Sequence, residues 1–128
     1  MTHRNVCAVR GAITVDSNNP IAIASATLEL LEGIMQQNGL LPEDIISAFF
    51  TLTRDLDASF PAAAARELPG WNLVPMLCAN EVAVHNELTM CIRVMIHCYS
   101  SRARDQIKHV YLRGAKVLRP DLNGKGFT

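Results

Sequence analysis

Only one segment of this 128-residue sequence carries the 3.6-residue apolar period of a long amphipathic helix. The segment starts at Asn19, an expected N-cap, continues with Pro20 at the first helical position and stops at Gly39. Most other segments resemble strands, and one helix of this length cannot cover a whole sheet. We therefore expect an α+β fold in which one long helix covers a mixed sheet and partner subunits bury the rest in a small closed ring.

The remaining elements are predicted from residue type and from the proline and glycine residues that end helices and strands. β-branched and aromatic runs predict strands, and alanine-rich or polar stretches predict short helices and turns. Pro75 lies within one predicted strand and places that strand at an edge, or marks its end. The predicted strands cover residues 5–15, 45–53, 71–77, 88–99 and 107–112, with a short helix at 61–68 and helical turns at 41–44 and 101–106.

Composition narrows the class of protein. Hydrophobic residues make up 49% of the chain, which predicts a packed core; we expect a single domain over residues 1–122 and a flexible tail over 123–128. Twelve basic residues balance twelve acidic ones, which argues against a nucleic-acid or anionic-membrane partner. No segment reads as a signal peptide or membrane span, so we expect a cytoplasmic protein. The four cysteines form no CxxC pair and no zinc pattern with the histidines, so no metal is predicted.

The most informative charge in the sequence is Arg93, in the middle of the most strongly predicted strand. Strand alternation places it on one face with Cys91, Met95 and His97, and leaves an apolar opposite face. A guanidinium group among apolar neighbours requires an anionic partner, because burying it unpaired is costly. That partner is either a core carboxylate or a bound anion, and Arg93 considered alone favours the structural ion pair.

Three further polar residues lie where binding sites are common. Arg10 and Glu81 each lie where a predicted strand meets a loop, and Tyr111 offers either a hydroxyl to an anion or a packed core ring. The sequence contains no glycine-rich phosphate loop, no nucleophile elbow and no HExxH motif. Such a polar set suits binding of a dianionic small molecule without a nucleophile, a metal or a cofactor.

Several short motifs appear together in one order. Any one of them is weak evidence, but their common order and spacing, without a gap from about residue 8 to residue 122, is specific. They are VRGA (9–12), TV (14–15), FPA (60–62), REL (66–68), GW (70–71), VP (74–75), Cys78 with Glu81, CIRVM (91–95), DQI (105–107), HVYL (109–112) and VLRPDL (117–122). In these motifs the sequence resembles the AroH-class chorismate mutases, isomerases of aromatic amino-acid biosynthesis that rearrange chorismate to prephenate.

The resemblance implies a homotrimer with a pseudo-α/β-barrel arrangement and an active site at each subunit interface. It also implies roles for matching residues. Arg93 would hydrogen-bond the ether oxygen of chorismate, Glu81 and Cys78 the ring hydroxyl, and Arg10 and Tyr111 a carboxylate. Residues from Leu77 through Ala79 and Asn80 to Glu81 would line the pocket, Phe60 and Arg66 would come from the neighbouring subunit, and Leu118 and Arg119 would help to close the mouth.

The implied reaction explains these residue types. It is an intramolecular pericyclic shift in which a C–O bond breaks while a C–C bond forms, with no covalent or acid–base step. Negative charge grows on the ether oxygen, so a fixed cation there stabilises the transition state more than the ground state. Carboxylate-binding groups also hold the substrate in its compact reactive shape.

Two positions depart from the family pattern, and two alternatives stay open. The family often has Lys where this chain has Ala63, and a hydroxyl residue where it has Leu77. The loss of a cation at the rim predicts a raised KM with kcat largely kept. The alternatives are a RidA-like trimer, which also places Arg in an interface pocket, and a family member that binds a metabolite without converting it.

Overall fold

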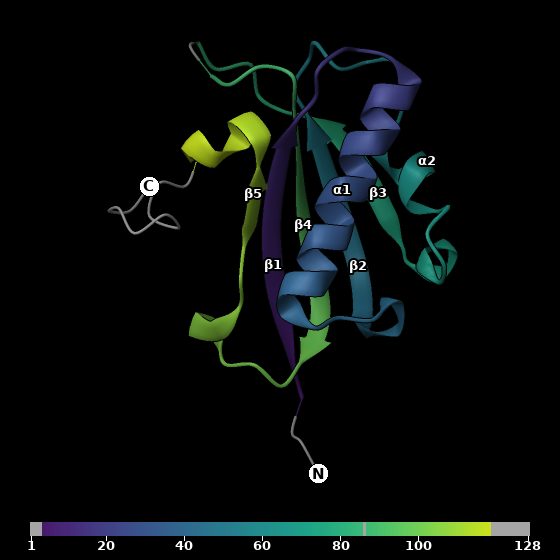
Figure 1. Ribbon diagram of the computed structural model, residues 1–128, viewed down its shortest axis with the longest axis vertical. Coiled ribbons are helices and arrows are strands. Elements are labelled where there is room, and N and C mark those ends of the chain that lie inside the picture. Colours follow the sequence, from purple (N-terminus) through teal and green to yellow (C-terminus); the bar gives the residue numbers. More distant parts are fainter. Residues whose placement is uncertain (1–3, 86, 119–128) are drawn as a thin grey trace.

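A five-stranded mixed sheet forms one layer of the molecule, and helix α1 packs against it as the second layer (Figure 1). The computed structural model describes residues 4–85 and 87–118. The strands lie in the order β3-β2-β4-β1-β5. The elements are β1 (Asn5–Thr14), α1 (Pro20–Asn38), β2 (Ile45–Leu52), α2 (Pro61–Ala65), β3 (Met76–Asn80), β4 (Cys91–Ser100) and β5 (Val110–Leu112), with 3₁₀ turns η1 (Pro42–Asp44), η2 (Trp71–Leu73), η3 (Arg104–Gln106) and η4 (Arg113–Leu118).

Strand β4 lies at the centre of the sheet and is antiparallel to both of its neighbours, β1 and β2. The two outer pairs, β1 with β5 and β2 with β3, are parallel. In the register, Arg93 lies between Ala12 of β1 and Thr51 of β2. The residue that the sequence singled out therefore lies in the middle of the sheet, where its neighbours on both sides are fixed by backbone pairing.

Helix α1 has the ends that the sequence predicted. The Asn19 side-chain oxygen accepts the Ala22 N–H at 2.8 Å, and Pro20 occupies the first turn. Gly39 ends the helix with φ of +61°, the left-handed conformation that favours glycine. The helix buries one face against the sheet, including Ile23, Leu30, Leu31 and Ile34.

Gly11 lets α1 approach the sheet closely. A Cβ atom at this position would lie 2.7 Å from the Ile34 Cδ1 atom and 3.0 Å from the Val110 carbonyl oxygen. Both distances are shorter than a normal van der Waals contact, so the helix and β5 pack at a separation that only glycine allows.

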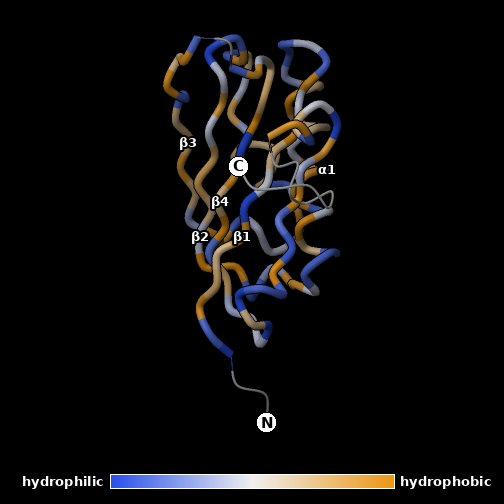
Figure 2. The backbone as a smooth tube through the Cα atoms, turned by 90° about the vertical axis from the view of Figure 1, so that its left-hand side faces the viewer, coloured by the Kyte–Doolittle hydropathy of each residue, from blue (hydrophilic) through white to orange (hydrophobic). Residues whose placement is uncertain are grey.

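The two faces of the sheet differ sharply, as the alternation in β4 predicted. Ile92, Val94, Ile96 and Cys98 are buried beneath α1. No α-helix of the described ranges 4–85 and 87–118 covers the other face, which Figure 2 shows edge-on with α1 on the opposite side. This open face carries partly exposed apolar side chains from four strands, among them Val6, Phe49, Leu77, Met95 and Tyr99.

The predicted strand at 71–77 is wrong. Residues Trp71–Leu73 form the turn η2, and the strand starts at Met76 instead. Gly70 turns the chain with φ of +84°, and the Trp71 ring is buried in the core. Pro75 has no backbone N–H to donate, but its carbonyl oxygen accepts a hydrogen bond from the Ala48 N–H at 3.1 Å. It lies just before β3, an edge strand, and an edge position was one of the two predicted interpretations of this proline.

Two other predicted strands are too long, because side chains take backbone hydrogen bonds that the sheet would otherwise use. Strand β4 begins at Cys91 and not at residue 88, since the Asp55 carboxylate accepts the N–H of Met90, whose φ is +53°. Strand β5 begins at Val110 and not at residue 107. Asn38 exchanges two hydrogen bonds with the backbone of Lys108, which holds that segment away from the ladder.

Some predictions about the chain ends stay untested. Arg119 and the predicted tail over 123–128 lie outside the described residues, and the single domain over 1–122 stays a prediction. Within the described ranges, no helix is both long enough and apolar enough to cross a membrane.

Candidate active site

Arg93 and Glu81 form an ion pair at the centre of the open face. Arg93 Nε lies 3.1 Å from Glu81 Oε2, and the Arg93 and Glu81 side chains are only 31% and 16% exposed. The Thr51 hydroxyl donates to the same Oε2 atom at 2.7 Å. Two neighbours therefore hold the carboxylate, and its contact with Arg93 is an ion pair, because the Nε–H makes no hydrogen bond to it. The carboxylate partner that burial of Arg93 requires is thus present in the chain.

Thr51 is a site residue that the sequence analysis missed. Its hydroxyl reaches Glu81 because β2 pairs with β3, which ends one residue before Glu81, and the β2–β4 register places Thr51 opposite Arg93. The only local signal is a hydroxyl at an alternating position of a predicted strand, which is common in sheets. The pairing register, which the sequence alone does not give, is what identifies it.

A hollow on the open face brings Arg93 together with Arg10 and Tyr111. It has a volume of about 150 Å³, and its lining includes Thr51 and Phe49 as well. The hydroxyl of Tyr111 is buried, whereas the Arg10 side chain is exposed. Pockets that enclose a small ligand usually have about 300–1,000 Å³. The hollow is therefore too small to hold such a ligand alone and supplies one wall of a larger site.

Glu81 also borders a second hollow, of about 250 Å³, which lies above the first at the end of the sheet. This hollow is lined by the loop that follows β3 and by residues 53–55 after β2. Glu81 thus lines this second hollow while its carboxylate contacts Arg93, which lines the first. A ligand bound at Arg93 could reach Glu81 with a neutral polar group, because the carboxylate can accept a hydrogen bond.

The residues of β3 split between the two faces of the sheet. Leu77 and Ala79 pair with Phe49 and Thr51 and lie on the open face, where both are exposed. Cys78 instead pairs with the buried Phe50 and packs against the core beneath the helices. The Cys78 thiol therefore lies on the helix side of the sheet, and only the backbone of Cys78 is available to a ligand on the open face. Asn80 shares the face of Leu52 and is exposed at the strand end.

Phe60 and Arg66 lie apart from the hollow in the same chain. They flank α2, which packs against α1 on the helix side of the molecule (Figure 1). Both are exposed, and Phe60 has 67% of its surface accessible. Neither lines the hollow at Arg93, so they can contribute to a site there only from a second copy of the chain.

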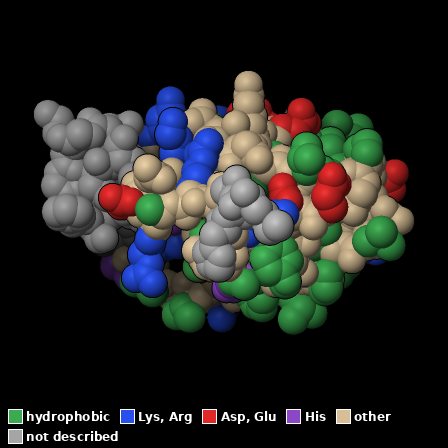
Figure 3. All heavy atoms as spheres, turned by 90° about the horizontal axis from the view of Figure 1, so that it is seen from below, with side chains coloured by type: hydrophobic (Ala, Val, Ile, Leu, Met, Phe, Trp, Pro, Cys, Tyr) green, Lys and Arg blue, Asp and Glu red, His purple; other side chains and the backbone are tan. Residues whose placement is uncertain are grey.

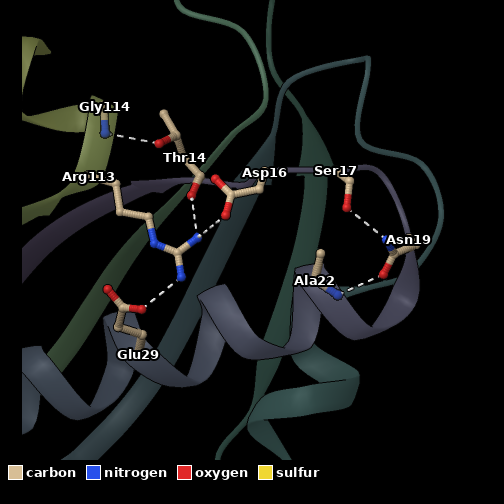
Figure 4. A network of polar contacts seen from close by, with 8 residues as sticks. All are labelled: Thr14, Asp16, Ser17, Asn19, Ala22, Glu29, Arg113 and Gly114. Atoms are coloured by element: carbon tan, nitrogen blue, oxygen red, sulfur yellow. Dashed lines mark hydrogen bonds and ion pairs between the residues drawn. The ribbon is translucent and has the colours of Figure 1, made fainter.

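Leu118 reaches the open face because Arg113 anchors the C-terminal turn η4. The Arg113 guanidinium donates to Glu29 of α1 at 2.8 Å and to the Thr14 carbonyl at 3.2 Å, and Gly114 N–H donates to the Thr14 hydroxyl (Figure 4). The turn then packs over β1 and β4. Leu118 lies with Tyr111 and Leu88 against a small cluster of Ala12, Cys91 and Ala115.

The Cys91 thiol lies beside Arg93 and stays neutral. Burial raises the pKa of this thiol to about 11, although the neighbouring Arg93 acts in the opposite direction. Burial also raises the pKa of Cys98 to about 11. A thiolate at position 91 would neutralise part of the Arg93 charge; the protonated form leaves that charge to Glu81 and to a bound anion.

These thiol pKa values predict how the cysteines react. At pH 8 a thiol with a pKa of about 11 is roughly 0.1% thiolate, against about a quarter for a free cysteine with a pKa of about 8.5. We expect iodoacetamide to modify Cys7 and Cys78, which are half-buried, well before Cys91 and Cys98 in the native protein. Peptide mass spectrometry measures the order, and all four should react at similar rates in urea. Native labelling of Cys91 as fast as Cys78 would contradict the prediction.

No group of three or more His, Cys, Asp or Glu side chains is arranged to hold a metal ion within residues 4–85 and 87–118. The polar groups of the site are instead guanidinium, carboxylate and hydroxyl groups around an open hollow. Such a set can bind an anion, donate hydrogen bonds to it and stabilise charge that develops on it.

Comparison with known proteins identifies the family. Residues 6–122 match the family model for chorismate mutase type I. This chain belongs to the chorismate mutase type I family. The chorismate mutase AroH of Bacillus subtilis is 45% identical over 115 residues, which span 90% of this chain and 91% of that protein. The AroH protein of Thermus thermophilus is also 45% identical over 115 residues, spanning 89% and 93%.

A solved structure gives the same family. The chorismate mutase from Clostridium thermocellum superposes with a TM-score of 0.83 at 49% sequence identity, covering 86% of this chain and 97% of that one. The predicted family, the α+β fold and the enzyme class, an isomerase, are thereby confirmed. The RidA-like alternative is set aside by the same comparisons.

Proposed function

We propose that this chorismate mutase family member converts chorismate to prephenate in a site that two subunits share, with Arg93 as the residue that stabilises the transition state. The observation that carries the proposal is the placement of Arg93, Arg10 and Tyr111 around one hollow, with Glu81 held against Arg93 at 3.1 Å. Two cations and a hydroxyl in one small hollow match a substrate that carries two carboxylates and an ether oxygen.

Each group has a separate task in the proposed reaction. Arg10 and Tyr111 bind a carboxylate and hold the substrate in its compact conformation. Arg93 donates to the ether oxygen, where negative charge grows as the C–O bond breaks and the C–C bond forms. The Glu81 carboxylate accepts a hydrogen bond from the ring hydroxyl. The ion pair with Glu81 fixes Arg93 before the substrate arrives, so that little reorganisation is needed during the reaction.

The open face supports the proposed homotrimer. Exposed apolar side chains on a sheet face mark a surface that another protein surface covers. Phe60 and Arg66 lie on the helix side, so a neighbouring copy could bring them to the hollow that Arg93 lines and enlarge it to the size of a small-ligand site. Sedimentation velocity measures the oligomeric state, and a monomer at micromolar concentration would contradict this arrangement. The cytoplasmic location stays a prediction.

The decisive test is the disappearance of chorismate absorbance with the purified protein, with prephenate identified as the product. Rapid conversion supports the proposal. Binding of chorismate without conversion would favour the alternative of a binding-only protein, and neither binding nor conversion would mean that the family fold has been kept without its activity.

Position 63 tests the role of the rim. Ala63 is exposed on α2, one helical turn before Arg66, and the family often has Lys there. We expect Ala63→Lys to lower the KM for chorismate by about two- to fivefold with little change in kcat, because an added exposed cation contributes up to about 1 kcal/mol to anion capture. Steady-state kinetics at low and high salt measure the effect, with Ala63→Gln as the neutral control. An improvement that persists at 1 M salt, or that Gln reproduces, would contradict an electrostatic origin.

A further inference from the structure

One hydrogen bond links strand β1 at Arg10 to the segment that leads into Tyr111. The backbone N–H of Arg10 donates to Nδ1 of His109 at 3.0 Å. His109 immediately precedes β5 and lies two residues before Tyr111. The bond therefore connects Arg10 to the segment that positions Tyr111, the other residue proposed to bind one carboxylate of the substrate.

The geometry of the sheet explains why a histidine is placed there. In an antiparallel ladder, successive N–H groups point alternately to the two sides of a strand. The Val15 N–H donates to the Met90 carbonyl oxygen just before β4, so the backbone N–H groups of the odd-numbered residues of β1 point toward β4. The N–H of Arg10, an even-numbered residue, therefore points toward β5. Strand β5 pairs with β1 only from Val110 onward. The imidazole nitrogen takes the place of the carbonyl that a longer β5 would offer.

The small size of the β5 ladder makes this bond matter. Strand β5 is an edge strand of three residues, and its register with β1 extends over Gly11, Ala12 and Ile13 alone. Arg10 lies opposite Met95 of β4 as a non-hydrogen-bonded pair, so its backbone N–H has no acceptor on that strand. Loss of the bond would therefore loosen β5, and with it the position of Tyr111 relative to Arg10.

The bond itself fixes which nitrogen of the His109 ring can carry the proton. Nδ1 accepts a hydrogen bond only when the ring proton is on Nε2. His109 also lines a hollow of about 650 Å³ at the lower end of the molecule. Its other titratable or charged lining residues are Cys7, His97, Arg102 and Arg104. Figure 3 shows this end, with Lys and Arg side chains around a hollow.

We propose that His109 is a positioning residue for the chorismate mutase reaction, in which its neutral Nδ1 holds the backbone of Arg10 and so sets the spacing between Arg10 and Tyr111. This proposal rests on the proposed function for its kinetic consequences, but the hydrogen bond itself can be tested without activity. His109 does not contact the substrate in this arrangement, so its effect falls on substrate binding more than on the chemical step.

The kinetic test compares two substitutions at His109. Leucine has a similar size and no acceptor, whereas asparagine places an amide oxygen near the position of Nδ1. We expect His109→Leu to raise the KM for chorismate about tenfold, the effect of one lost hydrogen bond, with a smaller change in kcat. His109→Asn should recover most of that loss. Lys108→Leu, an exposed neighbour, is the matched control and should leave both constants unchanged.

A second measurement separates this proposal from the proposed function. Hydrogen exchange of the Arg10 amide, followed by NMR, should be slow in the unmodified protein and in His109→Asn, and at least tenfold faster in His109→Leu. An inactive unmodified protein with this exchange pattern would overturn the proposed function and keep the hydrogen bond. Fast exchange of Arg10 in the unmodified protein, or equal KM values for the Leu and Asn variants, would overturn the role of His109.

Discussion

Replacing Arg93 by alanine is expected to lower kcat/KM for chorismate by about a thousandfold or more, because it removes the fixed cation at the developing oxyanion. The loss should appear mainly in kcat, since in the proposed reaction Arg93 interacts more strongly with the transition state than with the substrate. Stopped-flow or steady-state loss of chorismate absorbance measures it. The substitution also leaves the Glu81 carboxylate, which is only 16% exposed, without its cation.

Arg93→Lys separates charge from geometry. Lysine keeps the positive charge but lacks the Nε and the planar fork, so it cannot hold Glu81 and reach the ether oxygen in the same way. We expect a loss of at least about a hundredfold for this variant too. Arg102→Lys, which changes an arginine that donates to the Gln37 carbonyl at the other end of the molecule, is the matched control. Activity of Arg93→Ala within tenfold of the unmodified protein, with normal thermal stability, would refute the role of Arg93.

The second large effect is expected for Gly11→Ala, which should lower the free energy of unfolding by about 1–3 kcal/mol. The new methyl group would have to displace the Ile34 side chain and the Val110 backbone carbonyl, which lie 2.7 Å and 3.0 Å from the Cβ position. The Ile34 side chain can move, but Val110 is held in the β5 ladder. Urea denaturation measures the loss, and the displaced β5 should also raise the KM, because Tyr111 follows Val110.

Gly33→Ala is the matched control on the facing helix. A Cβ atom there would lie 3.5 Å from Val110 Cγ1 and 3.8 Å from Leu112 Cδ1, which are ordinary contacts. Alanine is the better helix former by about 1 kcal/mol, so this variant should be more stable than the unmodified protein. If both glycine variants change stability in the same direction, close approach of α1 to the sheet is not what requires Gly11.

Local signals in the sequence located most elements correctly. Asn19, Pro20 and Gly39 define α1, because capping and helix termination depend on residues within one turn of the helix end. The alternation around Arg93 gave the buried and open faces of β4, since side chains of a strand alternate whatever its neighbours are. Apart from Trp71–Leu73, which form a turn instead of a strand, the errors are at strand ends, where Asn38 and Asp55 provide side-chain partners that are distant in sequence.

The site was only partly accessible to the same reasoning. Arg93, Arg10, Glu81 and Tyr111 were recognised as candidates, and the structure brings them to one region of the open face. Thr51 and His109 were not recognised, because their contacts arise from strand register. The predicted contact of Cys78 with the ring hydroxyl stays a prediction, and the pairing of Cys78 with the buried Phe50 leaves its backbone as the group nearest the open face.

The sequence by itself determined the helix and its ends, the presence of a strand-rich sheet, the buried face of β4 and, through motifs in a fixed order, the chorismate mutase family. These properties depend on neighbouring residues or on the order of short motifs. Only the tertiary structure decided that Glu81 and Thr51 fix Arg93, that Gly11 lies under Ile34, and that His109 replaces a backbone acceptor for Arg10. These contacts join residues about 12 to 99 positions apart, and the pairing order of the strands, which local propensity does not encode, brings them together.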